Sequence, residues 1–351
     1  MEQTSNQGRY KTLFSILAVL LLIWGALGAL EITKEPYSGY TLSADNTITQ
    51  VREGSPAEAA GIRVGDKVTK IDNYSVESVA GLFERGRPAI GSQGSLTVNR
   101  GGGEQTLNFN YGERPMADIL ASSGASVLIG LAFLILGVMI YLKNPTRLST
   151  LFCALSLMLA AVYFPLPYFA SVSIRRLTIA ILNLIVGVTL AALLYYCLNF
   201  PRTKQALTSR PWLKQAIFIM APLVGILLAI INLAAPDISA TNSLLLSILI
   251  GVVYGGYLLL AVIAVIHSYV STSAEERSAT GLNLMLLGMV IGFGPIVISI
   301  LYHTILPHAG DLPGERFWNL TGIAIPIGLA LALMKLEGAT AEVKAGGEAT
   351  A

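Results

Sequence analysis

The feature that most constrains this chain is a series of long apolar segments that contain no charged residue. Each is near or above the roughly 20 residues that an α-helix needs to cross a hydrocarbon layer about 30 Å thick. Hydrophobic residues make up 54% of the 351 residues and charged residues only 13%, which excludes an ordinary water-soluble surface. We therefore predict an α-helical polytopic membrane protein with about eight transmembrane helices. The apolar segments are residues 12–30, 119–142, 148–169, 177–201, 215–236, 242–267, 281–302 and 317–334.

A polar stretch between the first two segments, residues 31–116, has the pattern of a compact β-rich domain. Residues 47–51 and 67–71 alternate apolar with polar side chains and contain β-branched residues, as strands do. Gly65, in the turn before the second of these strands, is expected to adopt a conformation that a β-branched residue resists. Two further alternating arms meet at the three glycines 101–103, which predicts a hairpin.

One short helix is expected inside this domain, after Ser78, whose hydroxyl can cap the helix N-terminus. Val79, Leu82 and Phe83 follow at the i, i+3, i+4 spacing, which places their side chains on one helix face. Gly86 is a suitable residue to end the helix.

The run VREGSPAEAAGIRVGDKVTKIDN resembles the core of a bacterial PDZ domain of the kind attached to high-temperature-requirement proteases. The resemblance extends over about residues 37–112. It includes YSGY, where such domains have the loop that receives the terminal carboxylate of a bound peptide. The family implies three roles: Ser38, Gly39 and Tyr40 hold the carboxylate, Thr41 and Leu42 pair with the peptide as an added strand, and Val79, Leu82 and Phe83 line the side-chain groove.

Gly39 suits the carboxylate loop because glycine tolerates positive φ and lets the backbone approach an anion closely. The free edge of a strand next to such a loop favours a peptide or protein ligand. Two alternatives remain at this point. The groove is a plain folded surface that packs against the membrane helices, or it accepts an internal segment of a protein.

The distribution of Lys and Arg predicts the orientation of the chain, because short cytoplasmic loops keep an excess of positive charge. With the N-terminus inside, eleven Lys and Arg lie in cytoplasmic segments and three in the short loops of the opposite side. Both termini are therefore expected in the cytoplasm and residues 31–116 outside it. A cleaved signal peptide is the alternative interpretation of the first segment, residues 1–30, and leaves the domain on the same side.

Motifs of catalysis or metal binding are not found in the sequence. None of the three histidines is followed by Glu, which excludes H-E-x-x-H, and no G-x-S-x-G occurs. His303 and His308 lie near Asp311 and Glu315, a set that could ligate zinc in principle, but the spacing of zinc motifs is lacking. We therefore expect no catalytic residue, no metal and no other cofactor, and we interpret the chain as a protein without enzymatic activity.

The distribution of charged residues also argues against transport and nucleic-acid binding. The apolar segments contain no Asp, Glu, Lys or Arg, which argues against a pump, an ion-coupled transporter or a channel. The basic residues are scattered and the net charge is +2, so nucleic acid is not an expected partner. Cys153 and Cys197 fall inside apolar segments and are expected to be buried small hydrophobes.

Glycine and proline indicate how the helices pack. Two glycine pairs have the small-xxx-small spacing that lets helix backbones approach closely. Proline within a segment is expected to kink its helix. The glycine pairs are Gly251 with Gly255 and Gly288 with Gly292, and the prolines include Pro165, Pro167, Pro295 and Pro326.

The second half of the chain carries another resemblance. The runs YLKNPTRLSTLFCALSLMLAAVYF, AEERSATGLNLMLLGMVIGFGPIVI and GIAIPIGLALALMKLE are similar to the membrane-embedded sensor region of histidine kinases of the competence quorum-sensing type. The resemblance implies a sensor in a bacterial inner membrane. No phosphoacceptor helix or ATP-binding segment follows, so kinase activity is not implied. We divide the chain into a first helix (1–30), the domain (31–116), a seven-helix bundle (117–335) and a flexible cytoplasmic tail (336–351).

These features predict a membrane sensor or adaptor that binds a peptide or protein outside the cytoplasm and signals to a separate partner, a kinase or a protease. Membrane lipid is the other expected partner. A scaffold or maturation factor that presents exported proteins to a membrane enzyme is the alternative, and a transporter or channel is the third.

The orientation is testable with cysteines introduced at Ser43 and at Thr208. Because Ser43 is expected outside the cytoplasm and Thr208 inside, an impermeant thiol reagent should label the first variant in intact cells and spare the second. Labelling of the Thr208 variant alone would reverse the orientation and place the domain in the cytoplasm.

Overall fold

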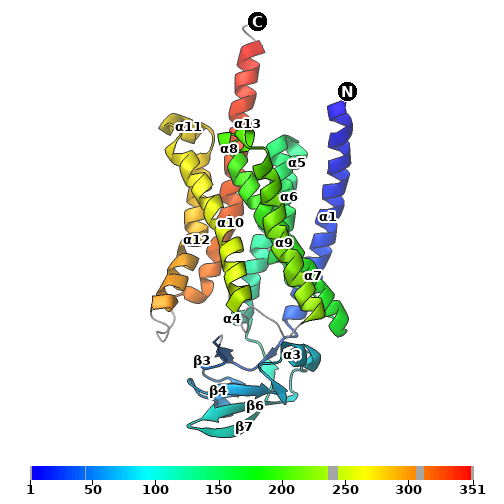
Figure 1. Cartoon of the computed structure of the whole chain (residues 1–351), viewed down its shortest axis with the longest axis vertical. Helices are drawn as coiled ribbons and strands as arrows, with labels where there is room; N and C mark the ends of the chain where they lie inside the picture. Colours follow the sequence, from blue (N-terminus) through cyan, green and yellow to red (C-terminus); the bar gives the residue numbers. More distant parts are fainter. Residues whose placement is uncertain (1, 44, 236–243, 306–311, 349–351) are drawn as a thin grey trace.

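A computed structural model describes residues 2–43, 45–235, 244–305 and 312–348 of the chain. Figure 1 shows an upright bundle of helices above a small β-rich domain. Helix α1 (Glu2–Ile32) begins, and helix α13 (Ala324–Glu348) ends, at the end of the bundle away from this domain. The two helix ends and the inserted domain therefore lie at opposite ends of the bundle (Figure 1).

Seven helices of the described residues are long and apolar enough to cross a membrane. Many of their apolar side chains are exposed, as expected for a surface that faces lipid rather than water. This confirms the predicted α-helical, multi-pass class. Besides α1 and α13 they are α5 (Ala125–Lys143), α7 (Val172–Asn199), α9 (Trp212–Ala234), α10 (Leu244–Val270) and α12 (Leu282–Ile305).

The third predicted segment, residues 148–169, forms a shorter helix than expected. Helix α6 (Arg147–Tyr163) has 17 residues and ends where Phe164 adopts an extended conformation with ψ 137°. Phe164 precedes Pro165, and the proline ring disfavours the helical conformation of the residue before it. The expectation that Pro165 and Pro167 kink a continuing helix is therefore wrong, because both lie beyond its end.

The C-terminal helix continues further than expected. Residues after 335 were expected to form a flexible tail, but α13 is helical as far as Glu348. The segment contains several Ala and Glu residues, which are strong helix formers. The remaining short helices are α4 (Met116–Ile119), a π-helix (Leu120–Gly124), α8 (Gln205–Ser209), α11 (Ala274–Ala279) and a 3-10 helix (Glu315–Ile323).

Small residues bring some of the helices into close contact. A Cβ added to Gly288 would lie 2.6 Å from the Ala324 carbonyl oxygen, so this glycine allows α12 and α13 to touch. Gly292 packs equally closely on Ile325 of α13. The prediction for Gly251 and Gly255 is wrong within the described residues, because an added Cβ there would meet no atom within 4 Å.

The β-rich domain contains the elements that its sequence predicts. A four-stranded antiparallel sheet has the order β5-β4-β6-β7, and the pairs β2-β3 and β1-β8 stand beside it. The strands are β1 (Pro36–Tyr37), β2 (Tyr40–Leu42), β3 (Ile48–Val51), β4 (Lys67–Ile71), β5 (Tyr74–Ser75), β6 (Gln93–Arg100), β7 (Gly103–Asn110) and β8 (Gly112–Glu113), and the helices are α2 (Pro56–Ala59) and α3 (Val79–Arg85).

Local signals in the sequence explain most of these boundaries. The β6–β7 hairpin turns at Gly101 and Gly102, both with positive φ, as predicted. The Ser78 hydroxyl accepts a hydrogen bond from the Gly81 N–H at 3.0 Å and so caps α3. Gly86, with φ 70°, follows the end of α3.

The domain has a hydrophobic core of its own. Its buried residues come from β3, α2, β4, β6 and β7 and their neighbours, and no residue of the membrane helices belongs to the cluster. A separate core is the property of a unit that folds independently. The buried set is Ile48, Ala57, Ile62, Val68, Leu96, Val98, Phe109 and Tyr111.

Gly65 provides a test of this fold. It has φ 92°, and an added Cβ would meet no atom within 4 Å, so a side chain at this position costs backbone strain and no clash. Gly65→Val should therefore destabilise the isolated domain (residues 33–115) by about 2 kcal/mol. Thermal unfolding followed by circular dichroism should show a Tm lower by roughly 10 °C.

Gly103→Val is the matched control. Gly103 is exposed at the start of β7 and is not among the residues with positive φ, so valine should change stability by less than about 0.5 kcal/mol. Equal Tm values for the two variants would contradict the strained turn at Gly65.

Candidate functional site

The expected carboxylate loop lies between β1 and β2. Two of its carbonyl groups accept hydrogen bonds from neighbouring segments, which fixes one side of the loop. The Ser38 carbonyl accepts a hydrogen bond from the Ala57 N–H at 2.9 Å, and the Gly39 carbonyl accepts one from the Arg52 N–H at 2.9 Å. A trans peptide directs its C=O and the following N–H to opposite sides. The N–H groups of Gly39 and Tyr40 therefore point away from α2 and β3, in the orientation that an incoming acceptor requires.

Gly39 has the conformation that its position in the sequence predicts. Its φ is 86°, and it is buried against Ser55, the residue that caps α2. A Cβ added to Gly39 would lie 2.1 Å from the Ser55 Cβ. Glycine is thus required here both for its backbone conformation and for close contact.

Strand β2 has one paired edge and one edge without a strand. Within the described residues it pairs only with β3, and Thr41 lies opposite Gln50. Tyr40 and Leu42 pack against the domain core and Thr41 is exposed, which is the alternation of a strand. Burial raises the pKa of the Tyr40 hydroxyl to about 12, so this group stays neutral at physiological pH.

Helix α3, the expected second wall of the groove, is anchored through its C-terminal arginine. The Arg85 Nε donates to the Asp72 carboxylate at 2.6 Å, and the Tyr111 hydroxyl donates to the same carboxylate at 2.9 Å. Leu82 is half-buried and does not belong to the core cluster or to the residues that cover it. The side chains of Val79 and Phe83 lie outside what the structure describes, so their predicted place in the groove stays a prediction.

A cavity of about 390 Å³ lies beside the carboxylate loop. Its size is within the range of small-ligand sites. Four of the predicted site residues line it, whereas Leu42 and Leu82 do not. The described lining consists of Glu35, Pro36, Tyr37, Ser38, Gly39, Tyr40, Thr41, Arg52, Arg114, Asp118 and Asn319.

Two ion pairs border the cavity, and one of them joins the domain to the bundle. Arg52, just after β3, pairs with Asp118 of α4, whose side chain is only 8% exposed. Arg114 pairs with Glu35 at 2.8 Å. Sequence reasoning missed this pair, because Arg52 and Asp118 are 66 positions apart and Asp118 lies outside the run that resembles a PDZ domain.

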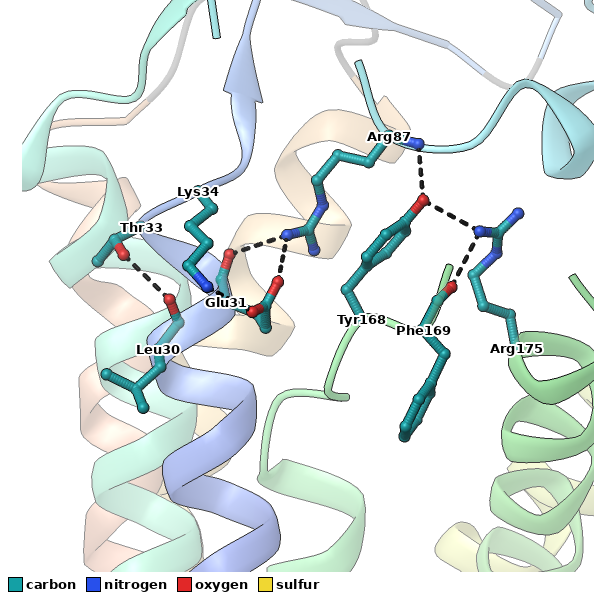
Figure 2. Close-up of polar contacts among 8 residues, drawn as sticks. All are labelled: Leu30, Glu31, Thr33, Lys34, Arg87, Tyr168, Phe169 and Arg175. Carbon is teal, nitrogen blue, oxygen red and sulfur yellow. Dashed lines mark hydrogen bonds and ion pairs between the residues drawn. The ribbon is translucent and has the colours of Figure 1, made fainter. Parts of the chain in front are cut away.

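A second polar junction ties α3 to two parts of the bundle (Figure 2). The guanidinium of Arg87, just after α3, donates to the Glu31 carboxylate near the end of α1 at 2.8 Å. Its backbone N–H donates to the Tyr168 hydroxyl at 2.9 Å, and its guanidinium lies over the Tyr168 ring, 4.1 Å from the centroid. Arg175 at the start of α7 donates to the same hydroxyl at 3.0 Å.

The remaining candidates for chemistry do not form a site among the described residues. No group of three His, Cys, Asp or Glu side chains is placed to hold a metal in the described part of the chain. His308 and Asp311 lie outside the described residues, and so does the side chain of His303. Cys153 and Cys197 are buried free cysteines, as predicted.

Comparison with known proteins supports one part of the chain. Residues 47–100 match the family model of the PDZ domain. No curated protein and no solved structure matches the chain. The match includes α3 but begins after the loop and β2 at residues 38–42, which the structure brings next to it. PDZ domains bind peptides or proteins, and residues 47–100 of this chain form a PDZ domain carried by a protein with several apolar, membrane-length helices.

Proposed function

We propose that the chain is a membrane sensor or adaptor that binds the C-terminus of a peptide or protein at its PDZ domain and signals to a separate partner. In this proposal the bundle lies in a bacterial inner membrane, the PDZ domain lies outside the cytoplasm, and the chain catalyses no reaction. A kinase or a protease is the expected partner. The observation that carries the proposal is the edge of β2 that has no strand partner among the described residues, which continues from a loop whose amides point away from α2 and β3.

The loop and the strand have the chemistry that peptide addition needs. An extended peptide can add to the unpaired edge of β2 through main-chain hydrogen bonds. The amides of Gly39 and Tyr40 can then receive the terminal carboxylate, since successive N–H groups in a turn form an anion-binding concavity. Arg52 and Arg114 line the adjacent cavity and place two guanidinium groups near this carboxylate, each of them paired with a carboxylate of the protein itself.

The signalling part of the proposal rests on how the PDZ domain is attached. The end of β3 is tied to α4 through Arg52, and the end of α3 is tied to α1 and to α7 through Arg87 and Tyr168. A ligand between β2 and α3 would act on both attachments. The ligand can shift the equilibrium between two arrangements of the bundle only to the extent that it binds one arrangement more tightly than the other.

Leu82→Lys tests the groove. A lysine at this position places a charge where an apolar ligand side chain should dock, which costs several kcal/mol of binding free energy. The fold should persist, because Leu82 is outside the core and lysine is a good helix former. A pool of fluorescent heptapeptides with free C-termini should bind the parent with a Kd on the order of micromolar, about −8 kcal/mol, and the variant at least tenfold more weakly.

Val64→Lys is the matched control, because Val64 is an apolar residue 63% exposed on the same domain, outside the predicted groove. It should bind like the parent. Amidation of the peptide C-terminus should weaken binding to the parent, since it removes the carboxylate. Binding that survives both Leu82→Lys and amidation would rule out the carboxylate groove.

A further inference from the structure

We propose that Asp118 is an internal competitor for the terminal carboxylate of the ligand. In the free protein Asp118 holds the guanidinium of Arg52, and the ligand binds fully only when its carboxylate takes the place of Asp118 on Arg52. This inference rests on the proposed function and names the regulation of the same site.

The burial pattern of α4 singles out Asp118. In this four-residue helix Asp118 is the buried side chain, whereas Met116 is 62% exposed and Leu120, the next residue after the helix, is 57% exposed. An aspartate is almost never buried unless it is paired. Met116 and Leu120 point outward, so the contact with Arg52 is one of the contacts that attach α4 to the PDZ domain.

Arg52 and Asp118 both line the cavity that the carboxylate loop lines. Arg52 is 39% exposed on its side chain, so it remains accessible from that cavity. Its backbone N–H also fixes the Gly39 carbonyl at 2.9 Å, which places the arginine directly beside the loop. A carboxylate that reaches the amides of Gly39 and Tyr40 therefore enters the neighbourhood of Arg52.

The charges of the cavity make the two carboxylates mutually exclusive. Arg52 and Arg114 supply two positive charges, and Glu35 and Asp118 supply two negative ones, so the lining is neutral before a ligand enters. A third carboxylate would leave one negative charge without a partner in a half-enclosed site, where like charges repel strongly. The conflict is relieved when Asp118 leaves Arg52.

Movement of α4 after the release of Asp118 can be transmitted to the membrane helix α5. The π-helix Leu120–Gly124 begins two residues after Asp118 and leads without a break into α5. A π-helical turn marks a position where the helical hydrogen-bond register changes, and such turns are frequent at functional sites. Movement of α4 on release would therefore be absorbed at this turn or passed to α5.

The test uses the full chain in lipid nanodiscs and a fluorescent heptapeptide with a free C-terminus, selected from a library on the Asp118→Asn variant. Asparagine keeps the size and a hydrogen-bonding oxygen but removes the competing charge. We expect Asp118→Asn to bind this peptide about tenfold more tightly than the parent in fluorescence anisotropy. Asp118→Glu, which keeps the charge, should bind like the parent and shows that the site tolerates substitution.

Two comparisons separate competition from a general loosening of the domain. The gain from Asp118→Asn should vanish in an Arg52→Gln background, because the competition acts through Arg52. Lys67→Gln breaks an exposed ion pair elsewhere in the domain, with Asp45, and should leave the affinity unchanged. The amidated peptide should bind the parent and Asp118→Asn equally.

The other possible outcomes contradict either this inference alone or the proposed function as well. Equal affinity of the parent and Asp118→Asn for the free peptide would overturn the competition and leave the proposed function standing. A gain that persists with the amidated peptide, or in the Arg52→Gln background, would overturn the role of the carboxylate. If the library yields no peptide that binds either protein, the proposed function fails, and this inference fails with it.

Discussion

Charged side chains, and not apolar packing, join the PDZ domain to the helices. The domain core contains no residue of the bundle, and the two clusters of buried apolar residues in the bundle contain no residue of the domain. The described contacts between the two include ion pairs and hydrogen bonds of Arg52 and Arg87 with carboxylates and with the Tyr168 hydroxyl. Such contacts form and break at lower cost than a buried apolar interface, and salt screens them where they are exposed.

This form of attachment suits a protein that has to respond to a ligand. A domain bound to the bundle by a large apolar surface would move as one body with it, whereas a domain on polar contacts can adopt a second position. The two junctions involve different helices: α4 at Arg52, and α1 with α7 at Arg87 (Figure 2). In the proposed mechanism, a change in the spacing of β3 and α3 would displace these separate helices relative to one another.

The sequence predicts those parts of the molecule whose cause is local. The cap at Ser78, the glycine turn at 101–102 and the positive φ of Gly65 each depend on residues a few positions away, and all are present. The partnership of Arg52 with Asp118 depends on how the whole domain is placed on the bundle, and no pattern in either segment contains that information. The same reason explains the helix contacts. The spacing of Gly251 and Gly255 predicts a contact that the described structure lacks, whereas Gly187 and Gly225, which have no second glycine four residues away, bring α7 and α9 together.

Strand β2 is only three residues long, and its pairing with β3 is irregular between Thr41 and Leu42. An added peptide can therefore share only a few main-chain hydrogen bonds with it before the strand ends. Recognition of so short a segment discriminates poorly among proteins that end in similar residues. Under the proposed function, the chain would report the total amount of exposed chain ends of one type, and contacts outside the groove would be needed to select an individual partner.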